Sequence, residues 1–233
     1  MSRLDAERQR LFADTTAGHT RTLVLGLARP ADWTLLHQVW QGVQADLELP
    51  APAIAVDGNE SYQLWLSLAQ PVSLAQAQDF LEQLRLRYLP EVASSRIHML
   101  PGADPSSPGL VRSAAAVPAR QETTGNWSAF VSPDLPAVFG EDPWLDTAPG
   151  LDQQADLLSR QKCISADAWE HARRCLRPAG HTTSLQQTEA PGTAPMEPRA
   201  FLHAVMNDTA APLALRIEAA RALLSAGERA RTP

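Results

Sequence analysis

One short segment constrains the fold more than any other part of the chain. Along residues 61–68 the side chains alternate, with Gln63, Trp65 and Ser67 on one side and Tyr62, Leu64, Leu66 and Leu68 on the other. A repeat of two residues with one apolar side is typical of a β-strand that buries one face. The preceding residues, 57–60, read Asp-Gly-Asn-Glu and favour a tight turn, because Gly and Asn tolerate positive φ angles. Together with the apolar run that begins at Ala53, this segment predicts a β-hairpin.

Similar patterns place two more strands and two helices around the hairpin. The helices are amphipathic, Asp32 can cap the first, and Ser73 begins a capping box for the second. The expected strands are 21–28, 53–57, 61–68, which Pro71 closes, and 95–100, and the expected helices are 32–47 and 73–88. The order β-α-β-β-α-β predicts an α+β, ferredoxin-like (RRM-like) domain: a four-stranded antiparallel sheet with both helices on one face.

The rest of the chain is divided around this domain. Residues 1–20 are expected to form an N-terminal arm, either a short helix or disordered chain, and residues 21–100 the βαββαβ domain. Prolines interrupt residues 101–177, which also carry scattered aromatic side chains. We therefore expect an irregular and partly helical extension that packs back on the domain. Residues 178–198 are expected to be a linker and residues 199–228 a C-terminal helical pair.

Charge and composition argue against several classes of protein. The net charge is −6 and neither half of the chain is basic, which disfavours a broad electrostatic DNA binder but allows a local basic patch. Two cysteines are too few for a disulfide framework. No apolar run approaches the roughly 18–20 residues that span a bilayer, and the polar N-terminus has no signal-peptide pattern. We expect a cytoplasmic protein without membrane association.

No catalytic motif, cofactor or metal site is expected. The chain contains no G-x-S-x-G, no P-loop and no G-x-G-x-x-G. One set of residues has zinc-ligand chemistry, namely Cys163, His171, Cys175 and His181, but it contains no C-x-x-C. Two of its members, Cys163 and Cys175, are more simply explained as small apolar residues.

The sheet face away from the two helices is the candidate site. Alternation places Gln63 and Trp65 on this face, and the neighbouring strands add Gly26, Arg96 and His98. A tryptophan on an open sheet face could stack a nucleic-acid base, as in RNA-recognition sheets. The polar side chains could contact a phosphate or a base edge, and the glycine lets a ligand come close.

Plainer structural roles remain open for the same residues. Trp65 could instead anchor residues 126–146, whose own aromatic side chains would fold over the sheet. Arg96 and His98, with Gln63, could be solvated sheet positions without a ligand. The sequence does not choose between these readings.

The hairpin resembles a strand-turn-strand of plasmid replication and mobilisation primases, members of the archaeo-eukaryotic primase superfamily. Asn59, Tyr62, Gln63 and Trp65 match that motif in type and approximate spacing, and a proline and a helix follow as in the family. The resemblance covers residues 21–100 and implies a domain related to nucleic-acid synthesis.

The resemblance does not extend to the catalytic residues of the family. Those primases hold divalent metal ions with paired acidic residues at the end of the first strand. Here the corresponding run is Leu25-Gly26-Leu27-Ala28, and a two-metal site needs several convergent carboxylates. We therefore assign no catalytic residue.

A second resemblance concerns the C-terminal segment. Residues 201–220 resemble a helical pair of small-terminase-like phage proteins. The leading hypothesis is a non-catalytic, primase-like accessory protein in the DNA metabolism of a mobile element, plasmid or phage. Its expected partners are single-stranded DNA or RNA, and a protein bound through the C-terminal helices. A protein-interaction module without a nucleic-acid role, and an active primase or nucleotidyltransferase, remain as alternatives.

Overall fold

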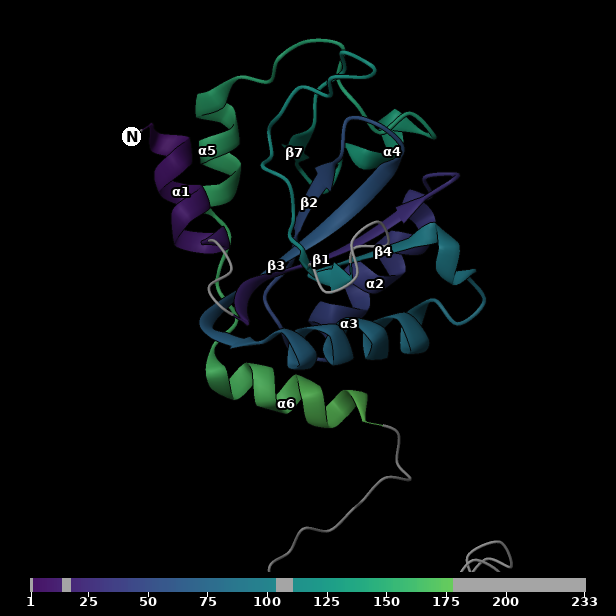
Figure 1. Ribbon diagram of the computed structural model, residues 1–233, viewed down its shortest axis with the longest axis vertical. Coiled ribbons are helices and arrows are strands. Elements are labelled where there is room, and N and C mark those ends of the chain that lie inside the picture. The colour runs from purple at the N-terminus through teal and green to yellow at the C-terminus, as the bar shows by residue number, and fades with distance from the viewer. Residues whose placement is uncertain (1, 14–17, 104–110, 178–233) are drawn as a thin grey trace, which may run out of the picture. The chain divides into compact units, whose positions relative to one another are not determined.

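A five-stranded antiparallel sheet forms the centre of the computed structural model, which describes residues 2–13, 18–103 and 111–177 (Figure 1). The strand order is β4-β1-β3-β2-β7. The described residues belong to one compact unit, Met1–His181. The predicted linker 178–198 and helical pair 199–228 lie outside the described residues.

A fifth strand joins the four that the sequence predicts. The predicted strands are β1 (His19–Ala28), β2 (Ala53–Val56), β3 (Ser61–Ser73) and β4 (Ile97–Leu100). The additional strand, β7 (Ala129–Val131), pairs with β2 in antiparallel register. The prediction of a four-stranded sheet is therefore incomplete, because a strand of 3 residues is too short to show a repeat of two. A separate short pair follows β4, formed by β5 (Gly102–Ala103) and β6 (Val111–Arg112).

β3 continues past Pro71, which the sequence predicts to end it. Thr22 pairs with Ser67, whereas Thr20 pairs with Val72, so the residues between Ser67 and Val72 bulge out of the β1–β3 ladder. Pro71 lies in this bulge, where the ladder does not require the backbone N–H that proline lacks. The strand therefore tolerates the proline, and pairing resumes beyond it.

Three helices cover one face of the sheet: α2 (Trp33–Ala45), α3 (Leu74–Tyr88) and α6 (Ala166–Leu176) (Figure 1). The Asp32 side chain accepts a hydrogen bond at the start of α2, and Ser73 forms the predicted capping box of α3. The main core lies between these helices and the sheet, where Leu64 and Leu81 are both buried. Within the described residues, no helix has the length and apolar character needed to cross a membrane.

Two helices cover much of the other face, contrary to the expectation that this face stays open. They are α1 (Arg3–Phe12), which packs against β1 and β3, and α5 (Leu151–Ser159), which packs against β7 and beside α1 (Figure 1). A second apolar cluster fills the space between them and the sheet; it includes Leu4, Leu11, Ala55, Trp65, Phe130 and Leu158. The predicted N-terminal arm thus contains a helix that belongs to the fold.

The outer edge of β7 is closed by one side chain from α5. Gln154 is 5% exposed. Its Oε1 accepts the backbone N–H of Phe130 at 2.8 Å, and its Nε2 donates to the carbonyl of the same residue at 2.9 Å. The amide therefore copies the hydrogen bonds of a neighbouring strand and blocks this edge against pairing with another chain.

Candidate functional site

The structure gives the four predicted site residues different surroundings, and Trp65 is buried instead of lying on an open face. Its side chain is 5% exposed. The indole lies edge-on to Phe12 of α1, with ring centroids 5.1 Å apart, and to Phe130 of β7, with centroids 5.5 Å apart. A buried indole cannot stack a base in this arrangement. The alternative reading of Trp65 is partly realised, since Phe130 belongs to residues 126–146, but α1 and α5 form most of the cover.

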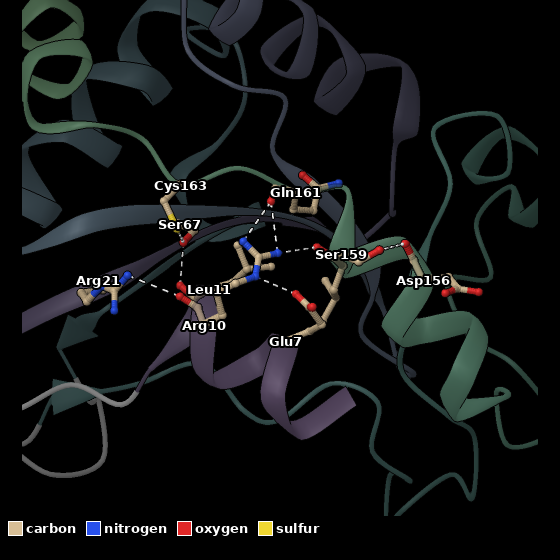
Figure 2. Close-up of polar contacts among 10 residues, drawn as sticks. Glu7, Arg10, Leu11, Arg21, Ser67, Asp156, Ser159, Gln161 and Cys163 are labelled. Atoms are coloured by element: carbon tan, nitrogen blue, oxygen red, sulfur yellow. Dashed lines mark hydrogen bonds and ion pairs between the residues drawn. The ribbon is translucent and has the colours of Figure 1, made fainter. Parts of the chain in front are cut away.

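Polar contacts hold α1, whose Phe12 packs on Trp65, in place; Figure 2 shows those made by Glu7 and Arg10. Arg10 donates to the carbonyl of Leu158 at 2.9 Å and to that of Gln161 at 3.2 Å, at the C-terminal end of α5. The Leu158 carbonyl also accepts the backbone N–H of Gln161 at 2.9 Å, and a cation is favourable there because the C-terminal end of a helix carries partial negative charge. Glu7 accepts from Arg10 at 2.7 Å and orients the guanidinium.

The C-terminal end of α1 is bound to the sheet in the same way (Figure 2). The Ser67 hydroxyl donates to the carbonyl of Leu11 at 2.6 Å, and Arg21 donates to the carbonyl of Arg10 at 3.4 Å. β3 and β1 supply these two donors. The helix that covers Trp65 is therefore attached both to α5 and to the strands beneath it.

Arg96 also has a structural role. It lies in η1 (Ser94–Arg96), just before β4, and donates to the carbonyls of Ala28 at 3.2 Å and Pro30 at 2.8 Å. These bonds support the backbone where β1 ends. The prediction that Arg96 projects from a strand into the site fails because β4 begins one residue later.

Gln63 and His98 are the two predicted residues that flank Gly26 on the sheet face, and Gln63 also accepts a hydrogen bond from Trp65. In the cross-strand register, Gly26 of β1 pairs with Gln63 of β3 on one side and with His98 of β4 on the other. A Cβ atom at Gly26 would lie 3.5 Å from Gln63 Cγ and 3.5 Å from His98 Cβ. Gln63, Gly26 and His98 thus form one row across three strands. Gly26 leaves a shallow gap in this row between the Gln63 amide and the His98 imidazole.

This row opens into a groove of about 710 Å³ at the β4 edge of the sheet. Exposed Arg112 of β6 and Gln78 of α3 also line it. The cover formed by α1 and α5 does not extend to this groove, whose lining includes no residue of either helix. Among the described residues, the part of the sheet face that α1 and α5 leave uncovered is thus the β4 edge.

The groove holds a neutral imidazole, and three carboxylates, those of Asp57, Glu60 and Glu82, line it together with Arg112. Burial, and after it the charge of Arg29, lowers the pKa of His98 below its ordinary value of 6.5, so this side chain is neutral at pH 7. Arg29 lies 3.6 Å from Glu60. Asp57 is occupied, since its carboxylate accepts the backbone N–H groups of residues 59–61 and the Ser61 hydroxyl. Uncharged hydrogen-bonding groups therefore dominate the row.

The described residues hold no cluster of three or more His, Cys, Asp or Glu side chains that could bind a metal ion. Cys175 and His171 are 3.5 Å apart on α6, whereas Cys163 lies against Ser67 at 3.1 Å. His181 is outside the described residues. No acidic residue occupies the end of β1, which closes with Leu27 and Ala28 before Arg29.

Two features of this region are absent from the sequence analysis. Arg112 enters the groove through the short β5–β6 pair, for which the sequence offers no signal. The sequence does contain a pattern that predicts the helix over Trp65. Leu4, Leu11 and Phe12 share one apolar face of this helix, at spacings of seven and eight residues.

Comparison with known proteins adds no identification. No family model matches the chain, and no curated protein matches it. The function is therefore argued from the geometry of the groove.

Proposed function

We propose that the chain is a non-catalytic, primase-like accessory protein that binds single-stranded nucleic acid in the groove at Gln63 and His98. One observation carries this proposal: three neighbouring strands bring an amide, a glycine and a neutral imidazole into one row on a sheet face. A flat base can approach the backbone over a glycine, while the flanking polar groups reach its edges. Trp65 takes no part in stacking.

The arrangement of the strands supports the domain type within this proposal. The strands β4-β1-β3-β2 are in the order of a ferredoxin-like βαββαβ domain, with α2 and α3 on one face. In this interpretation β7, α1, α5 and α6 are additions to the ferredoxin-like domain. The role in DNA metabolism of a mobile element, in the cytoplasm, remains part of the proposal through the primase resemblance.

The charge of the groove predicts a particular kind of binding. Arg112 is the basic residue that lines the groove, Arg29 is paired with Glu60, and the whole chain has a net charge of −6. We expect contact to about one phosphate, so the logarithm of affinity should fall against the logarithm of salt concentration with a slope of about −0.7. Base contacts, not phosphate contacts, would then supply most of the affinity.

Fluorescence anisotropy with labelled single-stranded DNA and RNA oligonucleotides tests the proposal. His98→Ala and Gln63→Ala should each weaken binding by about 1 kcal/mol, roughly fivefold. Gln38→Ala is the matched control, because Gln38 is exposed on α2, on the opposite side of the sheet. If the wild-type protein binds no oligonucleotide at low salt, the proposal is wrong and a protein-interaction module becomes the better reading.

A further inference from the structure

One hydrogen bond sets the orientation of the Gln63 amide. Trp65 Nε1 lies 2.9 Å from Gln63 Oε1. An indole N–H is only a donor, so the amide must turn its oxygen toward Trp65. The amide nitrogen, with its two hydrogens, is then the atom left to face the groove. No other described side chain contacts this nitrogen by a hydrogen bond.

The donor itself is held in place by the apolar cover. Phe12 and Phe130 pack edge-on against the indole of Trp65. Rotating the indole away from Gln63 would break both ring contacts and move a buried side chain. Gln63 therefore presents a donor to the groove in a fixed orientation, and Trp65 acts on the groove as a positioning residue.

We propose that this fixed amide makes the groove selective for bases that carry carbonyl oxygens, thymine and uracil above all. The inference rests on the proposed function and names the ligand class of the same site. Both exocyclic polar groups of thymine and uracil are carbonyls, whereas cytosine and guanine each have one carbonyl and adenine has none. An amide N–H directed into the groove can donate a hydrogen bond to a carbonyl oxygen of a base. It cannot form this bond with an amino group, which is itself a donor.

His98, on the other side of Gly26, can supply the second donor when the ring nitrogen that carries the hydrogen faces the base. A Cβ atom at Gly26 would already lie 3.5 Å from both Gln63 Cγ and His98 Cβ, so a pyrimidine ring would lie over Gly26 with its edges toward the ends of these two side chains. A neutral imidazole donates through one nitrogen. Gln63 and His98 can therefore donate to the two carbonyls of one thymine or uracil at the same time.

Oligonucleotides of equal length, oligo(dT), oligo(dU) and oligo(dC), provide the test in anisotropy titrations of the full chain. Cytosine differs from uracil by an amino group in place of one carbonyl, and oligo(dU) separates that change from the thymine methyl group. We expect oligo(dT) and oligo(dU) to bind about tenfold more tightly than oligo(dC), the usual discrimination of a well-placed base contact.

Three variants assign the selectivity to the amide. Gln63→Glu keeps an acceptor for Trp65 but removes the donor, and Asn59→Asp places the same added charge on the exposed side of the groove. Affinity for oligo(dT) should fall further in Gln63→Glu than in Asn59→Asp. Trp65→Phe keeps an aromatic ring in the cluster but frees the amide to rotate, so it should reduce the preference for oligo(dT) over oligo(dC) while binding persists. Thermal melts confirm that each variant is folded.

The outcomes separate this inference from the proposed function. If the wild-type protein binds none of the three oligonucleotides, the proposed function fails and the inference fails with it. If it binds all three with equal affinity, and Gln63→Glu behaves like Asn59→Asp, nucleic-acid binding stands and the selectivity for carbonyl-bearing bases is refuted.

Discussion

Replacing Trp65 by alanine tests whether α1 and α5 cover the sheet in solution. The indole is 5% exposed, packs against Phe12 and Phe130, and donates one hydrogen bond to Gln63. Truncation of a buried aromatic side chain costs about 3–5 kcal/mol. A groove of about 540 Å³ between α1 and residues 114–117 borders the indole, so water can enter part of the space. We therefore expect the lower end of the range, about 3 kcal/mol.

The loss is measured as a shift in the melting temperature. For a chain of this length 1 kcal/mol corresponds to about 2–4 °C, so Trp65→Ala should melt roughly 6–12 °C below the wild-type protein. Arg96→Ala is the matched control from the same predicted site. Its two hydrogen bonds to backbone carbonyls lie near the surface, and their loss should cost no more than about 1 kcal/mol.

One result would refute this reasoning. If Trp65→Ala melts within about 2 °C of the wild-type protein, the indole is not buried in solution and α1 does not cover the sheet. If the same variant also lost affinity for oligonucleotides, the result would indicate that Trp65 is exposed and stacks on a base.

Three further predictions concern other contacts. Arg10→Ala should lower the free energy of unfolding by about 1 kcal/mol in urea titrations, because the end of α5 loses its cation; no change would show that the contact is not formed. Gln154→Leu should cost about 1–3 kcal/mol for each backbone group of Phe130 that it leaves buried and unpaired, and a cost below 1 kcal/mol would contradict this. His98 has a lowered pKa when folded, so the unfolded chain binds the proton more readily and the wild-type protein should lose stability as pH falls through about 6.5. His98→Gln should lose less over the same range, and identical pH profiles would exclude the effect.

The sequence alone determined the parts of the fold that depend on local patterns. The hairpin follows from the alternation in residues 61–68 and its turn, and the helices that begin after Asp32 and Ser73 follow from their caps and apolar periodicity. Alternation also predicted that Gln63 and His98 share a face, because successive side chains on a strand point to opposite faces whatever the strand packs against. That part of the candidate site could therefore be found without a structure.

Which part of that face is covered depends on packing between segments that are distant in the sequence. Trp65 is buried by Phe12 and Phe130, which lie far from it in the chain, and Gln154 closes the edge of a strand that shows no periodic signal. Side-chain alternation states which face a residue occupies, but not which distant segment packs there, since that depends on the complementary shapes of surfaces brought together by folding. The same packing turned Trp65 from a stacking candidate into the residue that orients Gln63.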